Sequence, residues 1–115
     1  MKKETLQKRT KIANDIMYYI YTHIETNIDI EDLSIDLGIS KFHMHRIFKE
    51  AFGKNIYESI KSIRLQKASN LLLTNKYSTI SNIVNLCGYS SQSSFIKIFK
   101  DRFEMTPKEW KNGGY

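Results

Sequence analysis

Apolar residues recur every three to four positions along most of this 115-residue chain, which is the spacing of one face of an α-helix. The first such stretch, from about residue 11 to 26, has its apolar positions at Ile12, Ile16, Tyr19, Ile20 and Ile24. Glycine, proline and polar breaks divide the rest, so that further helices are predicted at about 30–37, 41–52, 56–73, 80–87, 92–103 and from 107 onward. The pattern therefore predicts an all-α fold of about seven helices.

The segment from residue 29 to 52, DIEDLSIDLGISKFHMHRIFKEAF, predicts two short helices joined by a tight turn. Gly38 lies at the turn, where a positive φ is needed, and Ser40 can cap the helix that follows. On that helix the apolar face comprises Met44, Ile47, Phe48 and Ala51, and the opposite face comprises Phe42, His45, Arg46 and Lys49. A short helix with an apolar back and a basic front fits the DNA major groove. We interpret this segment as a helix-turn-helix with 41–52 as its recognition helix.

The segment around Gly88 repeats this arrangement, as a comparison of GISKFHMHRIFKEAF with GYSSQSSFIKIFKDRF shows. In both, an apolar helix is followed by Gly, an apolar residue, Ser and a polar-fronted helix that ends in a Phe-Lys pair, with one more residue before that pair in the second copy. Residues 56–73 lie between the two and predict a helix about 27 Å long. Since successive major-groove faces lie about 34 Å apart, two recognition helices braced in this way could enter adjacent grooves.

The formal net charge of +6 is unevenly distributed, with +4 in residues 1–11, −3 in 12–54 and +5 in 55–115. Acidic side chains crowd the helix 30–37, so this helix is not expected to lie along DNA phosphates, whereas the basic balance elsewhere favours a nucleic-acid partner. The single cysteine, Cys87, excludes an internal disulfide, and no apolar run approaches the roughly 18 residues of a membrane span. We expect a cytoplasmic protein without a membrane partner.

The residues with the most specific pattern come from both halves of the chain. In the first half they are Leu33-Ser34, Leu37-Gly38-Ile39-Ser40-Lys41-Phe42-His43-Met44 and Arg46-Ile47-Phe48-Lys49. In the second half they are Ile83, the run Cys87 to Phe95, Phe99-Lys100, Phe103, Thr106-Pro107 and Trp110-Lys111. This pattern resembles the DNA-binding domain of the AraC/XylS family of bacterial transcription regulators. Three positions depart from it: Glu104 stands where Gly is usual, Lys111 where Arg is usual and Trp110 where Tyr is common.

The resemblance implies seven helices, with two recognition helices in adjacent major-groove segments of a promoter, and usually recruitment of RNA polymerase. By position, the family's base-contacting places fall on Phe42, His45, Arg46, Gln92, Ser93 and Lys97. Backbone-contacting candidates are Ser40, Lys41, Lys49, Ser90, Ser91, Lys100, Thr106 and Lys108. The serine and threonine residues among them lie near helix starts, where backbone amides suit phosphates. No cofactor is expected.

Each base-contacting candidate also has an ordinary explanation. Arg46 can bond bidentately to guanine O6 and N7, but an exposed arginine can also contact only phosphate or water. Phe42 can contact a thymine methyl group or pack onto the bundle, and His45 can donate to a base edge or stand free in solvent. Gln92 suits adenine, a phosphate or a capping role, and the ammonium of Lys97 contacts phosphate more readily than bases.

Other functional classes find less support. His43 and His45 point about 200° apart on a helix, so they do not share a metal ion, and Cys87 lies at an apolar position typical of the core. The sequence shows no Gly-rich phosphate loop and no Ser/His/Asp set, so an enzyme is not expected. A helical protein-interaction module with solvated basic faces remains an alternative. RNA binding is disfavoured because A-form RNA hides its major groove.

The predicted organisation comprises a basic arm (1–10), a first helix-turn-helix subdomain (11–53), a linker helix (54–74), a second subdomain (75–111) and a tail (112–115). Members of the family usually carry an effector-binding or dimerisation domain as well. The chain is therefore either a stand-alone regulator or a fragment. Because it ends in the linker-like residues KNGGY, we favour a fragment, with a C-terminal effector domain as its missing partner.

Overall fold

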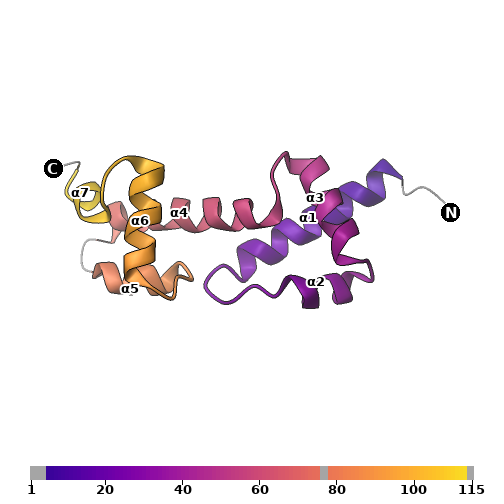
Figure 1. The fold of residues 1–115 in the computed structure, drawn as a ribbon, viewed down its shortest axis with the longest axis horizontal. Coiled ribbons are helices and arrows are strands. Elements are labelled where there is room, and N and C mark those ends of the chain that lie inside the picture. Colours follow the sequence, from indigo (N-terminus) through magenta and orange to yellow (C-terminus); the bar gives the residue numbers. More distant parts are fainter. Residues whose placement is uncertain (1–4, 76–77, 114–115) are drawn as a thin grey trace. The chain divides into compact units, whose positions relative to one another are not determined.

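The computed structural model describes residues 5–75 and 78–113 (Figure 1). In these ranges it contains only α-helices: α1 (Leu6–Thr22), α2 (Ile30–Leu37), α3 (Lys41–Phe52), α4 (Ile56–Thr74), α5 (Ile80–Leu86), α6 (Gln92–Phe103) and α7 (Pro107–Lys111). This confirms the all-α prediction. The chain forms two compact units, Met1–Lys61 and Ser62–Tyr115, and the boundary between them falls within α4.

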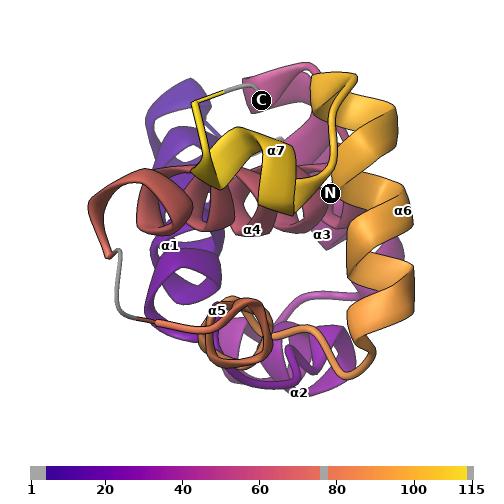
Figure 2. The same cartoon turned by 90° about the vertical axis from the view of Figure 1, so that its left-hand side faces the viewer.

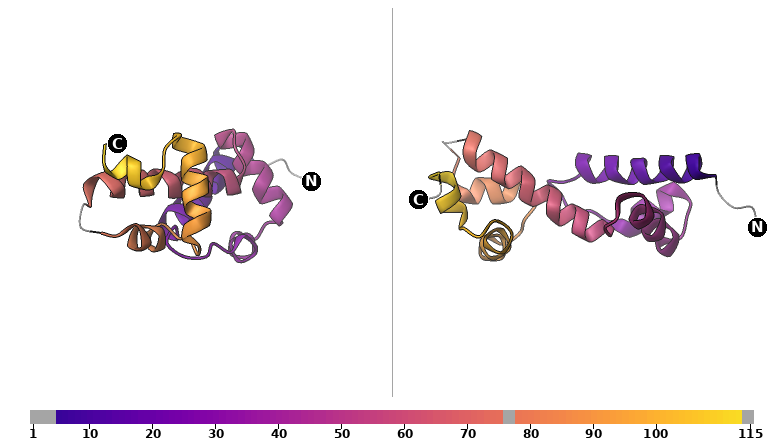
Figure 3. Two further views of the ribbon diagram at one scale, coloured as in Figure 1. Left: turned by 60° about the vertical axis from the view of Figure 1, so that its left-hand side comes forward. Right: turned by 90° about the horizontal axis from the view of Figure 1, so that it is seen from above.

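The first unit is built on α3, which packs against both α1 and α2. The right-hand view of Figure 3 shows α1 along its length, as a straight helix. The apolar side chains that the three helices bury are Ala13, Ile16 and Ile20 of α1, Ile30 and Leu33 of α2, and Met44, Ile47 and Phe48 of α3. The apolar stripes of the sequence therefore form this core. Ala51, predicted on the same face, is instead exposed, because it lies at the edge of α3 beside an open surface hollow.

The first helix begins earlier than predicted, at Leu6. The Thr5 hydroxyl accepts a hydrogen bond from the Lys8 amide at 3.1 Å and so caps the helix at this point. The helix also ends earlier, at Thr22. Residues 6–10, predicted as part of a basic arm, are therefore helical, and the first four residues of that arm lie outside the described residues.

Side-chain caps begin α2 and α3 at the positions that the sequence indicates. The Asp29 carboxylate accepts hydrogen bonds from two backbone amides in the first turn of α2, at 3.0 and 3.1 Å. The Ser40 hydroxyl accepts one from the His43 amide at 3.0 Å. Between them, Gly38 ends α2 with φ 68°, a left-handed conformation that glycine adopts without a steric penalty. The predicted tight turn is therefore confirmed.

The core of the second unit is formed by residues of α4, α5 and α6, together with Cys87, which directly follows α5. Its buried members are Leu65, Ala68, Leu72, Ile83, Val84, Cys87, Phe95 and Phe99. In the views of Figures 1 and 2, α5 lies near the start of α6 and α7 lies near its end. Trp110 anchors α7, because its ring lies 4.9 Å from that of Phe103 and its Nε1 donates to the carbonyl oxygen of Ser69 at 2.9 Å.

The two repeats differ in their turns and not in their second helices. Both α3 and α6 contain 12 residues. The chain passes from Gly38 to the start of α3 in three steps and from Gly88 to the start of α6 in four. The extra residue of the second copy therefore lengthens the turn and leaves the register of α6 equivalent to that of α3.

Glu104 ends α6 in a left-handed conformation, with φ 61° and ψ 17°. Within the described ranges it is the one non-glycine residue with a positive φ. Its amide donates to the carbonyl oxygen of Lys100 at 2.8 Å, as the amide of Gly53 donates to that of Lys49 at the end of α3. The turn therefore keeps the form expected with glycine at this position, and the Cβ of Glu104 carries a steric cost.

Candidate nucleic-acid interface

The outward face of α3 carries the side chains predicted to contact DNA. Phe42 is 75% exposed, and Lys41, Arg46 and Lys49 are exposed as well. The opposite face of the same helix buries Met44, Ile47 and Phe48 almost completely, which fixes the rotation of the helix. The predicted division of α3 into an apolar back and a basic, aromatic front is therefore confirmed, except that Ala51 is exposed and His45 is half-buried.

A shallow hollow of about 300 Å³ lies on this front. It is lined by Phe42, His45, Arg46, Lys49, Glu50 and Asn55. The guanidinium carbon of Arg46 lies 5.9 Å from the centre of the Phe42 ring, a cation–π distance. This contact restrains the arginine beside an aromatic surface and leaves its N–H groups facing solvent, where they can donate to a base edge.

His45 is the most enclosed residue of the front, because its ring packs on Tyr57 of α4 with 5.7 Å between ring centres. Burial, together with the positive charge of Lys41, lowers the pKa of His45 below its ordinary value of 6.5. The imidazole is therefore neutral at pH 7 and offers one donor and one acceptor. A neutral ring of this kind can contact a base edge without adding charge.

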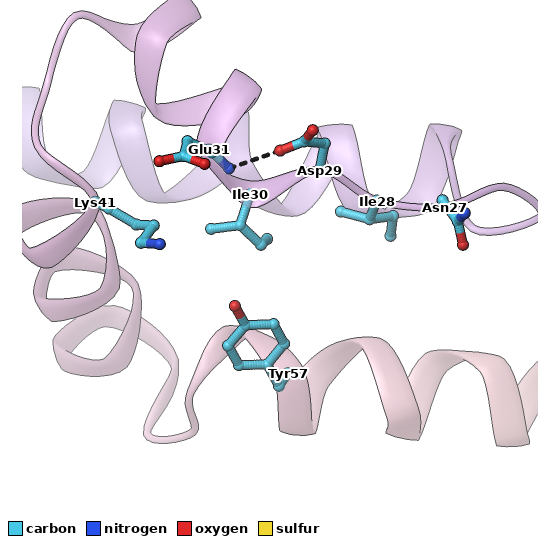
Figure 4. A pocket seen from close by; sticks show the side chains of 7 residues that line it. All are labelled: Asn27, Ile28, Asp29, Ile30, Glu31, Lys41 and Tyr57. Atoms are coloured by element: carbon cyan, nitrogen blue, oxygen red, sulfur yellow. Dashed lines mark hydrogen bonds between the residues drawn. The ribbon is translucent and has the colours of Figure 1, made fainter.

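Lys41 and Tyr57 also face a second hollow, of about 330 Å³, whose other lining residues are Asn27, Ile28, Asp29, Ile30 and Glu31 (Figure 4). The Tyr57 side chain is 60% exposed and points its hydroxyl into this hollow. The Asp29 carboxylate is already engaged as the cap of α2. The hollow thus places one cation and one hydroxyl beside the recognition front.

The opening residues of α1 add a further group. Arg9 forms an ion pair with Glu50, which lies on the edge of the α3 front. The sequence pattern does not identify Arg9, Glu50 or Tyr57 as site residues. Arg9 and Glu50 are 41 positions apart, and no local pattern links them.

The front of α6 is simpler than that of α3. Gln92, Ser93, Lys97 and Lys100 are exposed, as predicted. Ile96, which has the same place in α6 as His45 in α3, packs against the core. The α6 front therefore carries two ammonium groups, an amide and a hydroxyl, and it lacks the aromatic and imidazole groups of α3.

Most of the predicted backbone-contacting hydroxyls act as helix caps. Those of Ser40 and Thr106 accept hydrogen bonds from the amides of His43 and Glu109, at 3.0 and 3.2 Å. The Ser91 hydroxyl accepts one from the Ser94 amide at 3.3 Å. The first turns of α3 and α6 have further amides, which suit an anion. In α7 the first residue is Pro107, which has no N–H, and the Glu109 carboxylate accepts from the Thr106 amide.

Two remaining predictions concern Ser90 and Lys108. Ser90 and Lys108 are exposed, which is compatible with their assignment to the backbone-contacting set. Arg64 of α4 is half-buried, and its positive charge partly offsets the rise in the pKa of Tyr89 that burial causes.

A membrane-spanning helix and a metal-binding cluster are both absent from the part of the chain that the structure describes. Among residues 5–75 and 78–113, no helix is both long and apolar enough to cross a membrane. In the same ranges, no group of three or more His, Cys, Asp or Glu side chains could hold a metal ion.

Comparisons of the sequence identify relatives over most of the chain. A family model described as a helix-turn-helix domain matches residues 33–113. The probable transcription factor PqrA of Proteus vulgaris is 34% identical over 105 residues, which cover 90% of this chain and 85% of PqrA. The xylose operon regulatory protein of Escherichia coli strain K12 is 34% identical over 96 residues, which cover 84% of this chain and 24% of that protein. The chain thus spans about a quarter of the length of this relative.

Solved structures share the fold. The C-terminal domain of AraT, a response regulator from Geobacillus stearothermophilus, has a TM-score of 0.82 at 25% identity, over 89% of this chain and 84% of that one. The DNA-binding domain of AdpA, solved in complex with a target DNA, has a TM-score of 0.79 at 20% identity, over 88% of this chain and 90% of that one. With the helix-turn-helix match, these relatives show that the chain belongs to the AraC/XylS family of helix-turn-helix transcription regulators.

Proposed function

We propose that this chain binds double-stranded DNA sequence-specifically and regulates transcription at bacterial promoters. The observation that carries the proposal is the front of α3, where Arg46, Lys49 and Phe42 are exposed above a fully packed back. A helix with this cross-section fits the major groove, and its basic side chains suit DNA phosphates and base edges. The α6 front supplies a second recognition helix, which we place in an adjacent major-groove segment.

The proposed base-contacting residues are Phe42, His45 and Arg46 of α3, and Gln92, Ser93 and Lys97 of α6. Arg46 is the residue best suited to specify a base, since a guanidinium bonds bidentately to guanine. The proposed backbone-contacting residues are Ser40, Lys41, Lys49, Ser90, Ser91, Lys100, Thr106 and Lys108. Their hydroxyl, ammonium and first-turn amide groups position the protein without reading sequence.

The proposal includes partners beyond DNA. We place the chain at the nucleoid in the bacterial cytoplasm, where it recruits RNA polymerase, as the resemblance to the family implies. A C-terminal effector-binding domain is a further proposed partner, as the resemblance to the family implies. In functional terms, residues 11–53 and 75–111 form the two DNA-contacting subdomains, and 54–74 links them.

Selection of binding sites from random duplex DNA at near-physiological salt tests the proposal. Two short conserved blocks about one helical turn apart are expected if both recognition helices read bases. A single block would show that only one helix reads sequence. Weak, salt-sensitive binding without any enriched sequence would refute the proposal and favour the protein-interaction module.

A further inference from the structure

Arg46 and Glu50 lie one turn apart on the front of α3 and carry opposite charges. Side chains at positions i and i+4 of a helix are neighbours, and such pairs commonly form surface ion pairs. Both residues line the same hollow, yet within the described residues no ion pair joins them. Arg46 lies instead over the ring of Phe42, and Glu50 is paired with Arg9 of α1.

Arg9 reaches Glu50 because α1 and α3 are packed together. Ala13, one turn after Arg9, is buried with Ile16, and this fixes the side of α1 that faces α3. Arg9 and Glu50 both line a small hollow between the two helices. The position of the guanidinium is therefore set by the core of the first unit.

The pair is too exposed to contribute much to folding. The Arg9 side chain is 31% exposed and that of Glu50 is 53% exposed, and exposed ion pairs add little stability. What the pair does determine is which cation the Glu50 carboxylate holds. Without Arg9, Arg46 becomes a competing cation for Glu50, since the two residues lie at positions i and i+4 and line the same hollow. An unpaired carboxylate there would also repel the DNA phosphates.

We propose that Arg9 is a positioning residue for DNA recognition: by holding Glu50, it keeps the guanidinium of Arg46 available to a guanine. This inference rests on the proposed function. It assigns no DNA contact to Arg9 itself. It makes the specificity of α3 depend on a residue of the brace helix α1.

The test uses the whole chain and a duplex containing its selected site. The guanine that Arg46 reads is identified as the one whose replacement by 7-deazaguanine, which lacks N7, weakens the wild type but not Arg46→Ala. We expect Arg9→Gln to lower affinity about two- to fivefold and to reduce the preference for guanine over 7-deazaguanine by about twofold. The double variant Arg9→Gln/Glu50→Gln should regain both, because the competing carboxylate is gone.

Lys11→Gln is the matched control. It removes the same charge from the same helix, but the Lys11 ammonium pairs with Asp15 at 3.0 Å within α1 and has no partner on α3. It should leave the guanine preference unchanged. Thermal unfolding of each variant, followed by circular dichroism, should shift by no more than a few degrees.

Two results would overturn the inference alone. In one, Arg9→Gln keeps the full guanine preference of a selective wild type. In the other, adding Glu50→Gln to Arg9→Gln fails to restore it, which would show that the Glu50 carboxylate does not compete for Arg46. A wild type that prefers no sequence would overturn the inference together with the proposed function.

Discussion

Glu104→Gly should stabilise the second unit. Glu104 ends α6 at φ 61°, where a Cβ costs about 1–2 kcal/mol in an L-residue and nothing in glycine. Glycine also gives the unfolded chain more conformational freedom, which lowers stability by about 0.4–1 kcal/mol and offsets part of this gain. The side chain is exposed, and the backbone bond from its amide to the carbonyl oxygen of Lys100 at 2.8 Å does not need it. The difference between the midpoints of these two ranges gives an expected net gain of about 0.8 kcal/mol.

Urea denaturation followed by tryptophan fluorescence measures this gain. The chain has a single tryptophan, Trp110, whose ring lies 5.8 Å from Phe99 and 4.9 Å from Phe103, so its emission reports the core of the second unit. The midpoint should rise while the slope m stays the same, since the surface exposed on unfolding does not change.

Glu104→Ala is the control that separates backbone strain from charge. It removes the carboxylate from the C-terminal end of α6, where a negative charge is unfavourable, but it keeps the Cβ. Alanine should therefore gain at most a few tenths of a kcal/mol. If Glu104→Gly is no more stable than Glu104→Ala, the left-handed backbone at this position carries no strain, and the reasoning is wrong.

The remaining predictions concern binding and the two cores. Arg46→Ala should reduce the free energy of binding to the selected site by about 1–3 kcal/mol and relax the preference for the guanine that Arg46 reads. Lys100→Ala should weaken binding to all duplexes alike. Equal effects of the two variants on random DNA would contradict this. Tyr89→Phe should stabilise the second unit by about 1 kcal/mol in urea denaturation, because the buried Tyr89 hydroxyl has no hydrogen-bond partner among the residues that the structure describes. Burial also raises the pKa of Tyr89 to about 12, so above pH 10 the unfolded state loses the proton first and the stability of the wild type should fall. A fall of the same size in Tyr89→Phe would refute this assignment. Folding lowers the pKa of His45, so the unfolded state takes up the proton first as the pH falls. The free energy of unfolding should therefore decrease below pH 6.5, and this decrease should be smaller in His45→Gln than in the wild type.

Much of the candidate site was predictable because it lies on single helices. Phe42, Arg46 and Lys49 share a face through the 3.6-residue period alone, and burial of Met44 and Phe48 on the other side follows from the same period. The pairing of His45 with Tyr57 was not predictable, since these residues belong to different helices and meet only after α3 and α4 are arranged.

Local chemistry in the sequence determined where most helices begin and end. Asp29, Ser40 and Thr106 carry oxygens that satisfy first-turn amides, and Gly38 takes a left-handed turn without strain. These effects act over three or four residues, so the sequence by itself is sufficient to predict them.

Tertiary structure decided the features that join distant residues. Trp110 donates to Ser69, and Arg9 pairs with Glu50, each across 41 positions. No periodicity encodes such contacts, because they depend on how whole helices pack. The sequence therefore determined which side chains face outward on each recognition helix. The packing of α1 on α3 decided that one of the outward charges, the Glu50 carboxylate, is already paired with Arg9.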